Sequence, residues 1–265
     1  MGNTLKKNKY SLIAFDIDGT ILGNNHQVCS KLIKVVALLK KQGYLFTLVS
    51  ARMPQSVIKI AHALGVSDTY QIALNGSLIT DTKHNVLYTK TFTTQRVRGA
   101  LNTLDKQISR NYYDSFDWII EYPNSYTLKE ISILGDIILP RENNLPDEVN
   151  KITLIGEPHL LAIAQAKLIK DETLLVSQSH INYLEITCNT ISKFNGLAYY
   201  ASTLNIPIDE IIAFGDGEND MSMLSGVGLG VAMANAKDHV KASAADVAGY
   251  HYEEGVANYL SELLL

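Results

Sequence analysis

The sequence predicts an α/β fold in which a doubly wound parallel sheet carries an inserted α+β domain. Short apolar runs alternate with helical patterns in the first third of the chain and again in the last quarter. The segment between these parts differs in composition, because it holds the single Trp and four of the six Pro. The length of 265 residues fits one large domain or two modest ones.

The first third reads as strand, helix, strand, helix, strand, a rhythm that favours right-handed crossovers and a parallel sheet. Gly43 and Gly65 follow the two helical patterns as expected stops, and Pro54 can open the second helix. The predicted strands and helices, in chain order, are 11–15, 28–42, 44–49, 54–64 and 71–74.

The last quarter repeats this rhythm, and the middle of the chain has its own elements. In the last quarter we expect helices over 193–204, from Asn219, over 235–242 and over 254–264, with strands at 211–214 and 228–231. In the middle we expect helices over 94–108 and 160–169, and strands at 118–122, 151–155 and 173–176. The sequence therefore predicts a core made of residues 1–82 and 189–265, and an inserted domain over residues 83–188.

Composition excludes several classes of protein. The net charge of −4 argues against nucleic-acid binding through bulk charge, and 46% apolar residues are enough for a sizeable core. No apolar run is long enough to span a membrane, and Asp16 and Asp18 interrupt the first one too early for a signal peptide. Cys29 and Cys188 are far apart and are expected to be free thiols, which favours the cytoplasm. The oligomeric state is left open.

Polar residues follow the predicted core strands. Asp16-Ile17-Asp18-Gly19-Thr20 follows the first strand and Ser50 the second, while Lys193 opens the helix before the strand at 211–214. That strand is followed by Gly215-Asp216-Gly217-Glu218-Asn219-Asp220. Because ligands bind at the carboxyl ends of parallel strands, these residues are expected to converge there.

The residue types favour phosphoryl transfer assisted by Mg²⁺. Up to four carboxylates, on Asp16, Asp18, Asp216 and Asp220, would repel one another without a cation, and oxygen ligands alone favour Mg²⁺. Lys193 and the Ser50 hydroxyl could hold a phosphoryl group. One carboxylate could attack phosphorus while a second, two residues on, protonates the leaving oxygen and then activates water.

This pattern resembles the haloacid dehalogenase superfamily of aspartate-nucleophile phosphatases. Its four motifs are matched in order by Asp16 to Thr20, by Ser50, by Lys193 and by Gly215 to Asp220. The position and length of the insertion resemble those of the Cof-like subgroup (type IIB), which has a large α/β cap, and Asn75-Gly76 and Met233-Ala234-Asn235-Ala236 add to the likeness. The resemblance covers the core at both ends of the chain and implies a Rossmann-like core.

The resemblance implies roles for individual residues. Asp16 would be the nucleophile and a Mg²⁺ ligand, and Asp18 the general acid and base, with its carbonyl on the metal. Asp216 would be a metal ligand, with Asp220 and Asn219 in the metal shell or just outside it. Ser50, Lys193 and Asn219 would hold the phosphoryl group. The subgroup usually has Thr-Gly-Arg where this chain has Ser50-Ala51-Arg52, which leaves Arg52 open between a substrate contact and a surface or structural role.

The expected function is Mg²⁺-dependent hydrolysis of a small phosphorylated metabolite: a sugar phosphate, a nucleotide or a phosphorylated cofactor. A phosphomutase on the same fold and a non-catalytic phosphoryl-binding regulator are the alternatives. A receiver domain is disfavoured, since it is about half as long and has neither the second acidic loop nor an insertion. Trp118, Tyr122 and Tyr126 are expected to pack in the core of the insertion. The alternative is that they line a substrate pocket.

Overall fold

The computed structural model describes residues 9–134 and 145–265, which form two compact units. The first unit holds the chain up to Ala51, Val57–Leu87 and Ser192–Leu265, and the second holds Arg52–Ser56 and Tyr88–Ile191. The divisions at 87/88 and 191/192 lie a few residues beyond the sequence-based boundaries at 82/83 and 188/189. The first boundary differs because a hairpin of two strands, Leu78–Thr80 and Val86–Thr89, begins in the first unit and carries it as far as Leu87.

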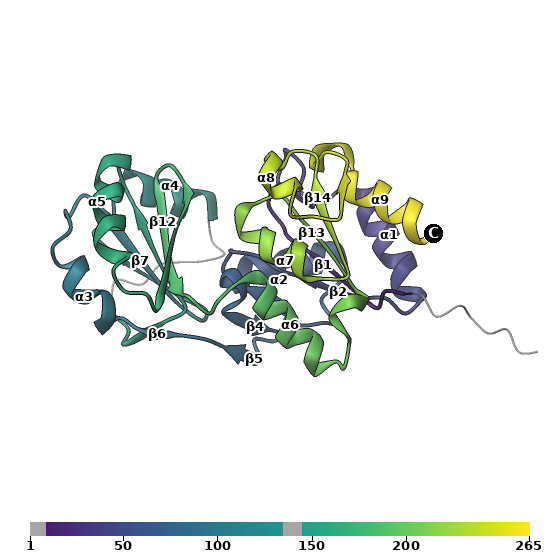
Figure 1. The fold of residues 1–265 in the computed structure, drawn as a ribbon, viewed down its shortest axis with the longest axis horizontal. Helices are drawn as coiled ribbons and strands as arrows, with labels where there is room; N and C mark the ends of the chain where they lie inside the picture. Colours follow the sequence, from purple (N-terminus) through teal and green to yellow (C-terminus); the bar gives the residue numbers. More distant parts are fainter. Residues whose placement is uncertain (1–8, 135–144) are drawn as a thin grey trace, which may run out of the picture. The chain divides into compact units, whose positions relative to one another are not determined.

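A five-stranded parallel sheet forms the centre of the first unit (Figure 1). In spatial order its strands are β15 (Asp246–Ala248), β14 (Leu229–Met233), β13 (Ile211–Gly215), β1 (Leu12–Phe15) and β2 (Leu45–Leu48). Phe15 at the end of β1 is in register with Leu48 on one side and Phe214 on the other. The chain therefore leaves these three strands at the same edge of the sheet, with β1 in the middle.

Helices of the expected periodicity surround this sheet. They are α1 (Ser30–Lys41), α2 (Pro54–Leu64), α6 (Lys193–Thr203), α7 (Met221–Gly226), α8 (Asp238–Lys241) and α9 (Gly255–Leu264). Helices α1 and α9 pack together. The ring of Tyr259 in α9 packs edge-on against the ring of Phe214, with 5.6 Å between the ring centroids. Helix α6 packs against α7. The central strands of the sheet lie between these helices and are buried on both faces. The sequences of these strands are therefore nearly continuous apolar runs.

The strand expected at 71–74 is only loosely part of this sheet. Strand β3 (Gln71–Ala73) joins it through a single parallel bridge between Val49 and Ile72. Its main partner is β4 (Leu78–Thr80), with which it forms an antiparallel hairpin that continues into β5 (Val86–Thr89). The connection between β3 and β4 is a 3₁₀ turn over Leu74–Gly76.

The second unit is built around a five-stranded antiparallel sheet. Its strands, in spatial order, are β11 (Leu174–His180), β12 (Tyr183–Cys188), β10 (Lys151–Ile155), β7 (Ser109–Asp114) and β8 (Asp117–Glu121). Helices α3 (Gln95–Leu101) and α5 (Pro158–Leu168) pack on one face over an apolar core that includes Val97, Ile152 and Leu161. Among the described residues, this unit also contains α4 (Ser125–Leu134) and the paired strands β6 (Phe92–Thr93) and β9 (Glu148–Val149).

Three sequence-based expectations need correction. The helix expected over 94–108 ends at Leu101, because the amides of Thr103 and Leu104 donate to carbonyls three residues back, which tightens the chain into a turn. The helix expected over 235–242 covers only Asp238–Lys241. Trp118 is buried, as expected, and its indole N–H donates to Asn111 Oδ1 at 3.0 Å, but Tyr122 and Tyr126 are only half-buried.

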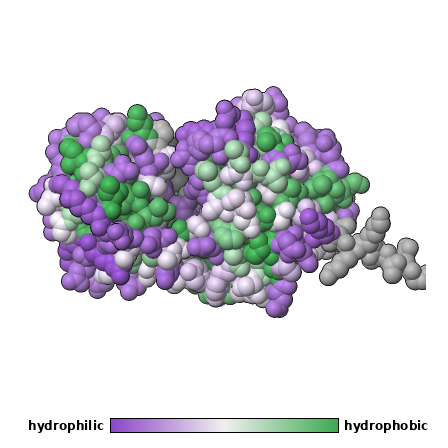
Figure 2. Space-filling model, viewed as in Figure 1, coloured by the Kyte–Doolittle hydropathy of each residue, from purple (hydrophilic) through white to green (hydrophobic). Residues whose placement is uncertain are grey.

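The surface is mixed in polarity. Figure 2 shows apolar patches among hydrophilic residues on the face in view, and the apolar side chains exposed in the second unit include Leu128, Ile163 and Ile181. Over residues 9–134 and 145–265, every helix is too short or too polar to span a bilayer.

Candidate active site

Two acidic loops meet at the carboxyl edge of the parallel sheet. Asp16 directly follows β1, and Asp216 directly follows its neighbour β13. The amide of Asp16 donates to the carbonyl of Phe214 at 2.9 Å, which continues the pairing of the two strands into the loops. Gly19 permits the close approach, since its φ is +72° and a Cβ there would lie 2.2 Å from Asp216 Oδ2.

Lys193 lies between two of these carboxylates. It is the first residue of α6, whose N-cap Ser192 accepts a hydrogen bond from the amide of Asn195. The Nζ of Lys193 is 2.6 Å from Asp16 Oδ1 and 2.6 Å from Asp220 Oδ1. All three side chains are buried, so this bridge is shielded from solvent.

Asp220 has both carboxylate oxygens engaged. Its Oδ1 accepts from Lys193, while its Oδ2 accepts from the amides of Asp216 at 3.0 Å and Gly217 at 2.8 Å. Asp220 thus ties the Asp216 loop to Lys193. The Asp220 carboxylate is fully buried, and these three hydrogen bonds replace the contacts with water that burial removes.

The carboxylates of Asp16, Asp216 and Asp220 form one cluster, in which an oxygen of each lies within 4.8 Å of the others. Burial and the neighbouring Asp220 raise the pKa of Asp16 from 3.8 to about 8, despite the opposing effect of Lys193. Burial and Asp220 likewise raise the pKa of Asp216 from 3.8 to about 6. The cluster therefore resists carrying its full negative charge without a further cation.

The other predicted site residues lie in the two acidic loops or in the segment that follows β2. Ser50 is buried two residues after β2, and its amide donates to the carbonyl of Ile72. Asn219 is exposed in the 3₁₀ turn over Glu218–Asp220. Asp18 is exposed two residues beyond Asp16. All seven predicted site residues belong to the first unit.

Two polar residues without a predicted role of their own contact the cluster. The hydroxyl of Thr20 donates to Asp16 Oδ2 at 3.2 Å. The side-chain amide of Asn235 donates to Asp216 Oδ2 at 3.0 Å and to the carbonyl of Gly19 at 2.9 Å. Asn235 lies two residues after the end of β14. The pattern that indicated the other site residues, a polar side chain after a core strand, therefore also indicates Asn235.

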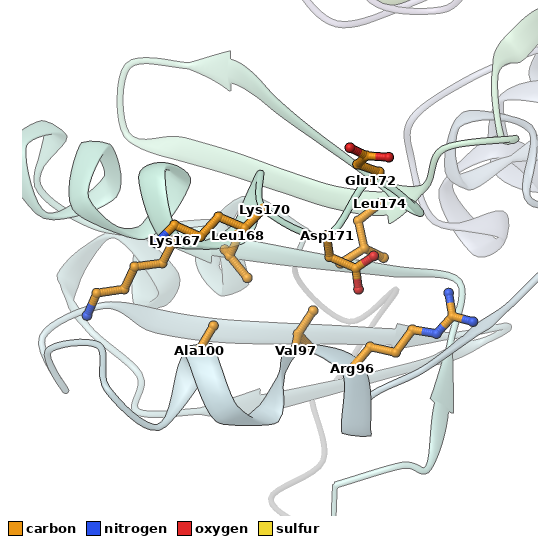
Figure 3. A pocket seen from close by; sticks show the side chains of 9 residues that line it. All are labelled: Arg96, Val97, Ala100, Lys167, Leu168, Lys170, Asp171, Glu172 and Leu174. Carbon is orange, nitrogen blue, oxygen red and sulfur yellow. The ribbon is translucent and has the colours of Figure 1, made fainter.

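A separate pocket of about 530 Å³ lies within the second unit, between α3 and the end of α5. Figure 3 shows Arg96, Lys167 and Asp171 among the side chains that line it. The guanidinium of Arg96 donates to the Thr173 hydroxyl, and Lys167 to that of Thr103. This pocket contains none of the predicted site residues.

Comparison with known proteins identifies the class to which this fold and site belong. The sequence profile of the haloacid dehalogenase-like hydrolases matches residues 13–260, so the chain belongs to this family. Phosphatase YwpJ of Bacillus subtilis is 29% identical over 292 aligned positions, covering 96% of this chain and 99% of that protein. The 5-amino-6-(5-phospho-D-ribitylamino)uracil phosphatase YcsE of the same organism is 26% identical, covering 96% of each chain.

A solved structure agrees with this family assignment. A haloacid dehalogenase-like hydrolase from Bacteroides thetaiotaomicron superposes with a TM-score of 0.84 at 25% identity, covering 97% of this chain and 100% of that one. The predictions of the superfamily, of the α/β fold with an inserted α+β domain, and of a hydrolase acting on phosphate esters are confirmed. The roles of individual residues stay predictions.

Proposed function

We propose that this phosphatase hydrolyses a small phosphorylated metabolite with Mg²⁺, by way of a phosphorylated Asp16. The observation that carries the proposal is the buried bridge from Lys193 to Asp16 and Asp220, with the exposed carboxylate of Asp18 two residues beyond Asp16. Because Asp18 is exposed, its carboxylate can exchange a proton with water close to the buried Asp16.

The donor set fits Mg²⁺. Lys193 forms ion pairs with two of the three clustered carboxylates, those of Asp16 and Asp220, and the cluster offers oxygen ligands only. Asp16, Asp216 and the Asp18 carbonyl would hold the ion, while the engaged oxygens of Asp220 favour a supporting position. When bound, Mg²⁺ supplies charge neutralisation for the carboxylates and the phosphoryl oxygens.

The chain's own residues would carry out two successive displacements. An oxygen of Asp16 forms a bond to phosphorus while the bond to the leaving oxygen breaks, and Asp18 gives that oxygen its proton. Asp18 then takes a proton from water, whose oxygen attacks phosphorus, and the bond to Asp16 breaks. The sum is an alcohol and inorganic phosphate, with both carboxyl groups restored to their starting protonation states.

The phosphoryl group would be held by Lys193, Ser50 and Asn219. Lys193 pairs with two carboxylates of the cluster, Asn219 lies in the turn beside Asp220, and Ser50 follows β2. We assign the choice of leaving group to the inserted segment at residues 83–188. The name of the relative YcsE, a phosphatase of a phosphoribityl compound, supports a small phosphomonoester as substrate. Sugar phosphates, nucleotides and phosphorylated cofactors all belong to this class.

A panel of these phosphomonoesters tests the proposal directly. We expect release of inorganic phosphate from at least one compound in Mg²⁺, and loss of that activity in excess chelator. Isomerisation of a sugar phosphate without phosphate release would indicate a phosphomutase instead. Binding of phosphate esters with no conversion of any kind would indicate a regulator, and full activity in chelator would contradict the metal assignment.

Stability should depend on pH in a direction set by the acidic cluster. Because the folded-state pKa values of Asp16 and Asp216 lie above 3.8, the folded chain binds more protons than the unfolded chain between about pH 4 and 8. Their contribution to the free energy of unfolding is therefore largest at low pH and falls as pH rises through about 6 and 8. Thermal unfolding in chelator measures this.

Addition of Mg²⁺ should oppose this loss of stability at high pH, because the ion favours the ionised carboxylates. We expect a larger rise in melting temperature at pH 8 than at pH 5. Titration calorimetry at about pH 6.5 in buffers of different ionisation enthalpy should show protons released on binding. A rise in melting temperature that is the same at both pH values would show that these two groups do not bind the ion.

A further inference from the structure

The 3₁₀ turn after β3 has an unusual backbone conformation. Leu74, Asn75 and Gly76 have φ values of +50°, +60° and +99° in succession. Positive φ suits Gly and is tolerated by Asn, but for Leu it is a genuine outlier that costs free energy. Leu74 is fully buried, and its carbonyl accepts from the amide and hydroxyl of Ser77, so the surrounding contacts hold the turn in this state.

This turn touches each chain segment that carries a predicted phosphate-holding residue. The amide of Asn75 donates to the carbonyl of Ser50 at 2.9 Å. The side-chain Oδ1 of Asn75 accepts from Nδ2 of Asn219 at 3.0 Å. Gly76 packs so closely on Ser192, the residue before Lys193, that a Cβ would lie 2.2 Å from the Ser192 carbonyl oxygen.

Backbone and side chain of Asn75 have separable functions in this arrangement. The backbone contact of Asn75 to Ser50, like the packing of its neighbour Gly76 on Ser192, joins parts of the fold and does not require an amide side chain. The side chain reaches Asn219, which is exposed in a short turn, so its rotamer depends on such a contact. We propose that Asn75 is a positioning residue whose Oδ1 fixes the amide of Asn219 for a phosphoryl oxygen, an assignment that rests on the proposed function.

The substitution Asn75→Gly separates these functions. Glycine accepts a φ of +60° without strain and keeps the N–H that donates to Ser50, but it removes the acceptor of Asn219. Asn205→Gly is the matched control, because Asn205 also has a positive φ, of +55°, and is exposed in the turn after α6. Both variants should unfold within about 2 °C of each other.

Kinetics with p-nitrophenyl phosphate and inhibition by inorganic phosphate give the test. In Asn75→Gly we expect KM and the inhibition constant for phosphate to rise about 3- to 10-fold, the effect of one hydrogen bond, with kcat changed less. Asn205→Gly should match the wild type. Because Asn75 acts through Asn219, adding Asn75→Gly to Asn219→Ala should cause little further change.

Three results would overturn the positioning role. Asn75→Gly could match Asn205→Gly in both constants, its effect could add in full to that of Asn219→Ala, or its activity could fall only in proportion to lost folded protein. Failure of the proposed function looks different, because the wild-type chain would then release no inorganic phosphate from any phosphomonoester of the panel.

Discussion

Replacing Asp16 by asparagine should lower kcat by about 10⁴-fold or more, with the chain still folded. An amide is a poor nucleophile, so the variant would leave phosphorus without an attacking group. Stability should change least at acidic pH, because burial raises the pKa of Asp16 and keeps its carboxyl group protonated there in the absence of Mg²⁺. The neutral amide resembles that protonated state in size and charge. Phosphate release and thermal unfolding in chelator measure the two effects.

The site of covalent phosphorylation gives a second readout. In Asp18→Asn, attack by Asp16 stays possible when the leaving group is good, but hydrolysis of the acyl phosphate is impaired. Mass spectrometry should then show one added phosphoryl group on the peptide that contains Asp16. Asp68→Asn, at an exposed position, is the control and should keep wild-type turnover. A label on a serine, histidine or cysteine peptide, or turnover by Asp16→Asn, would contradict the nucleophile assignment.

Much of the first unit could be predicted because its strands are buried on both faces and end in polar residues. Leu12–Phe15 and Ile211–Gly215 are continuous apolar runs, and parallel pairing brings their ends to one edge. The proximity of Asp16 and Asp216 therefore follows from two local patterns and one topological rule. The close approach of Lys193 to both Asp16 and Asp220 could only be seen in three dimensions.

The second unit was harder to predict because its sheet is antiparallel and its pattern is broken by polar residues. Strand β7 contains Arg110 and Asn111, both buried, and its apolar periodicity is too weak to mark it as a strand. The contact between Asn75 and Asn219 could not be predicted for a different reason. Asn75 reaches a residue far from it in the sequence, and side-chain partners at such a separation leave no periodic signal.

Replacing Lys193 by methionine should strongly affect both stability and turnover. Methionine keeps much of the length and volume of lysine but leaves Asp16 and Asp220 buried without their shared cation. Loss of one partner of a buried ion pair costs about 3–5 kcal/mol, because the remaining charges stay desolvated. The loss should be greater at pH 8 than at pH 5, where Asp16 is protonated. Denaturant unfolding at the two pH values measures it.

If Lys193 holds the phosphoryl group as proposed, turnover should fall by about 10²- to 10³-fold or more, since a preorganised positive group is removed. Lys40→Met is the matched control, because the Lys40 Nζ is also 2.6 Å from a carboxylate oxygen, that of Asp68, but Asp68 is 63% exposed. An exposed pair contributes about 1 kcal/mol or less, so Lys40→Met should keep nearly full stability and wild-type turnover. The two lysines make ion pairs of equal length and differ in burial and in their neighbours. If Lys193→Met were as stable and active as Lys40→Met, the bridge would be neither a structural nor a catalytic part of the site.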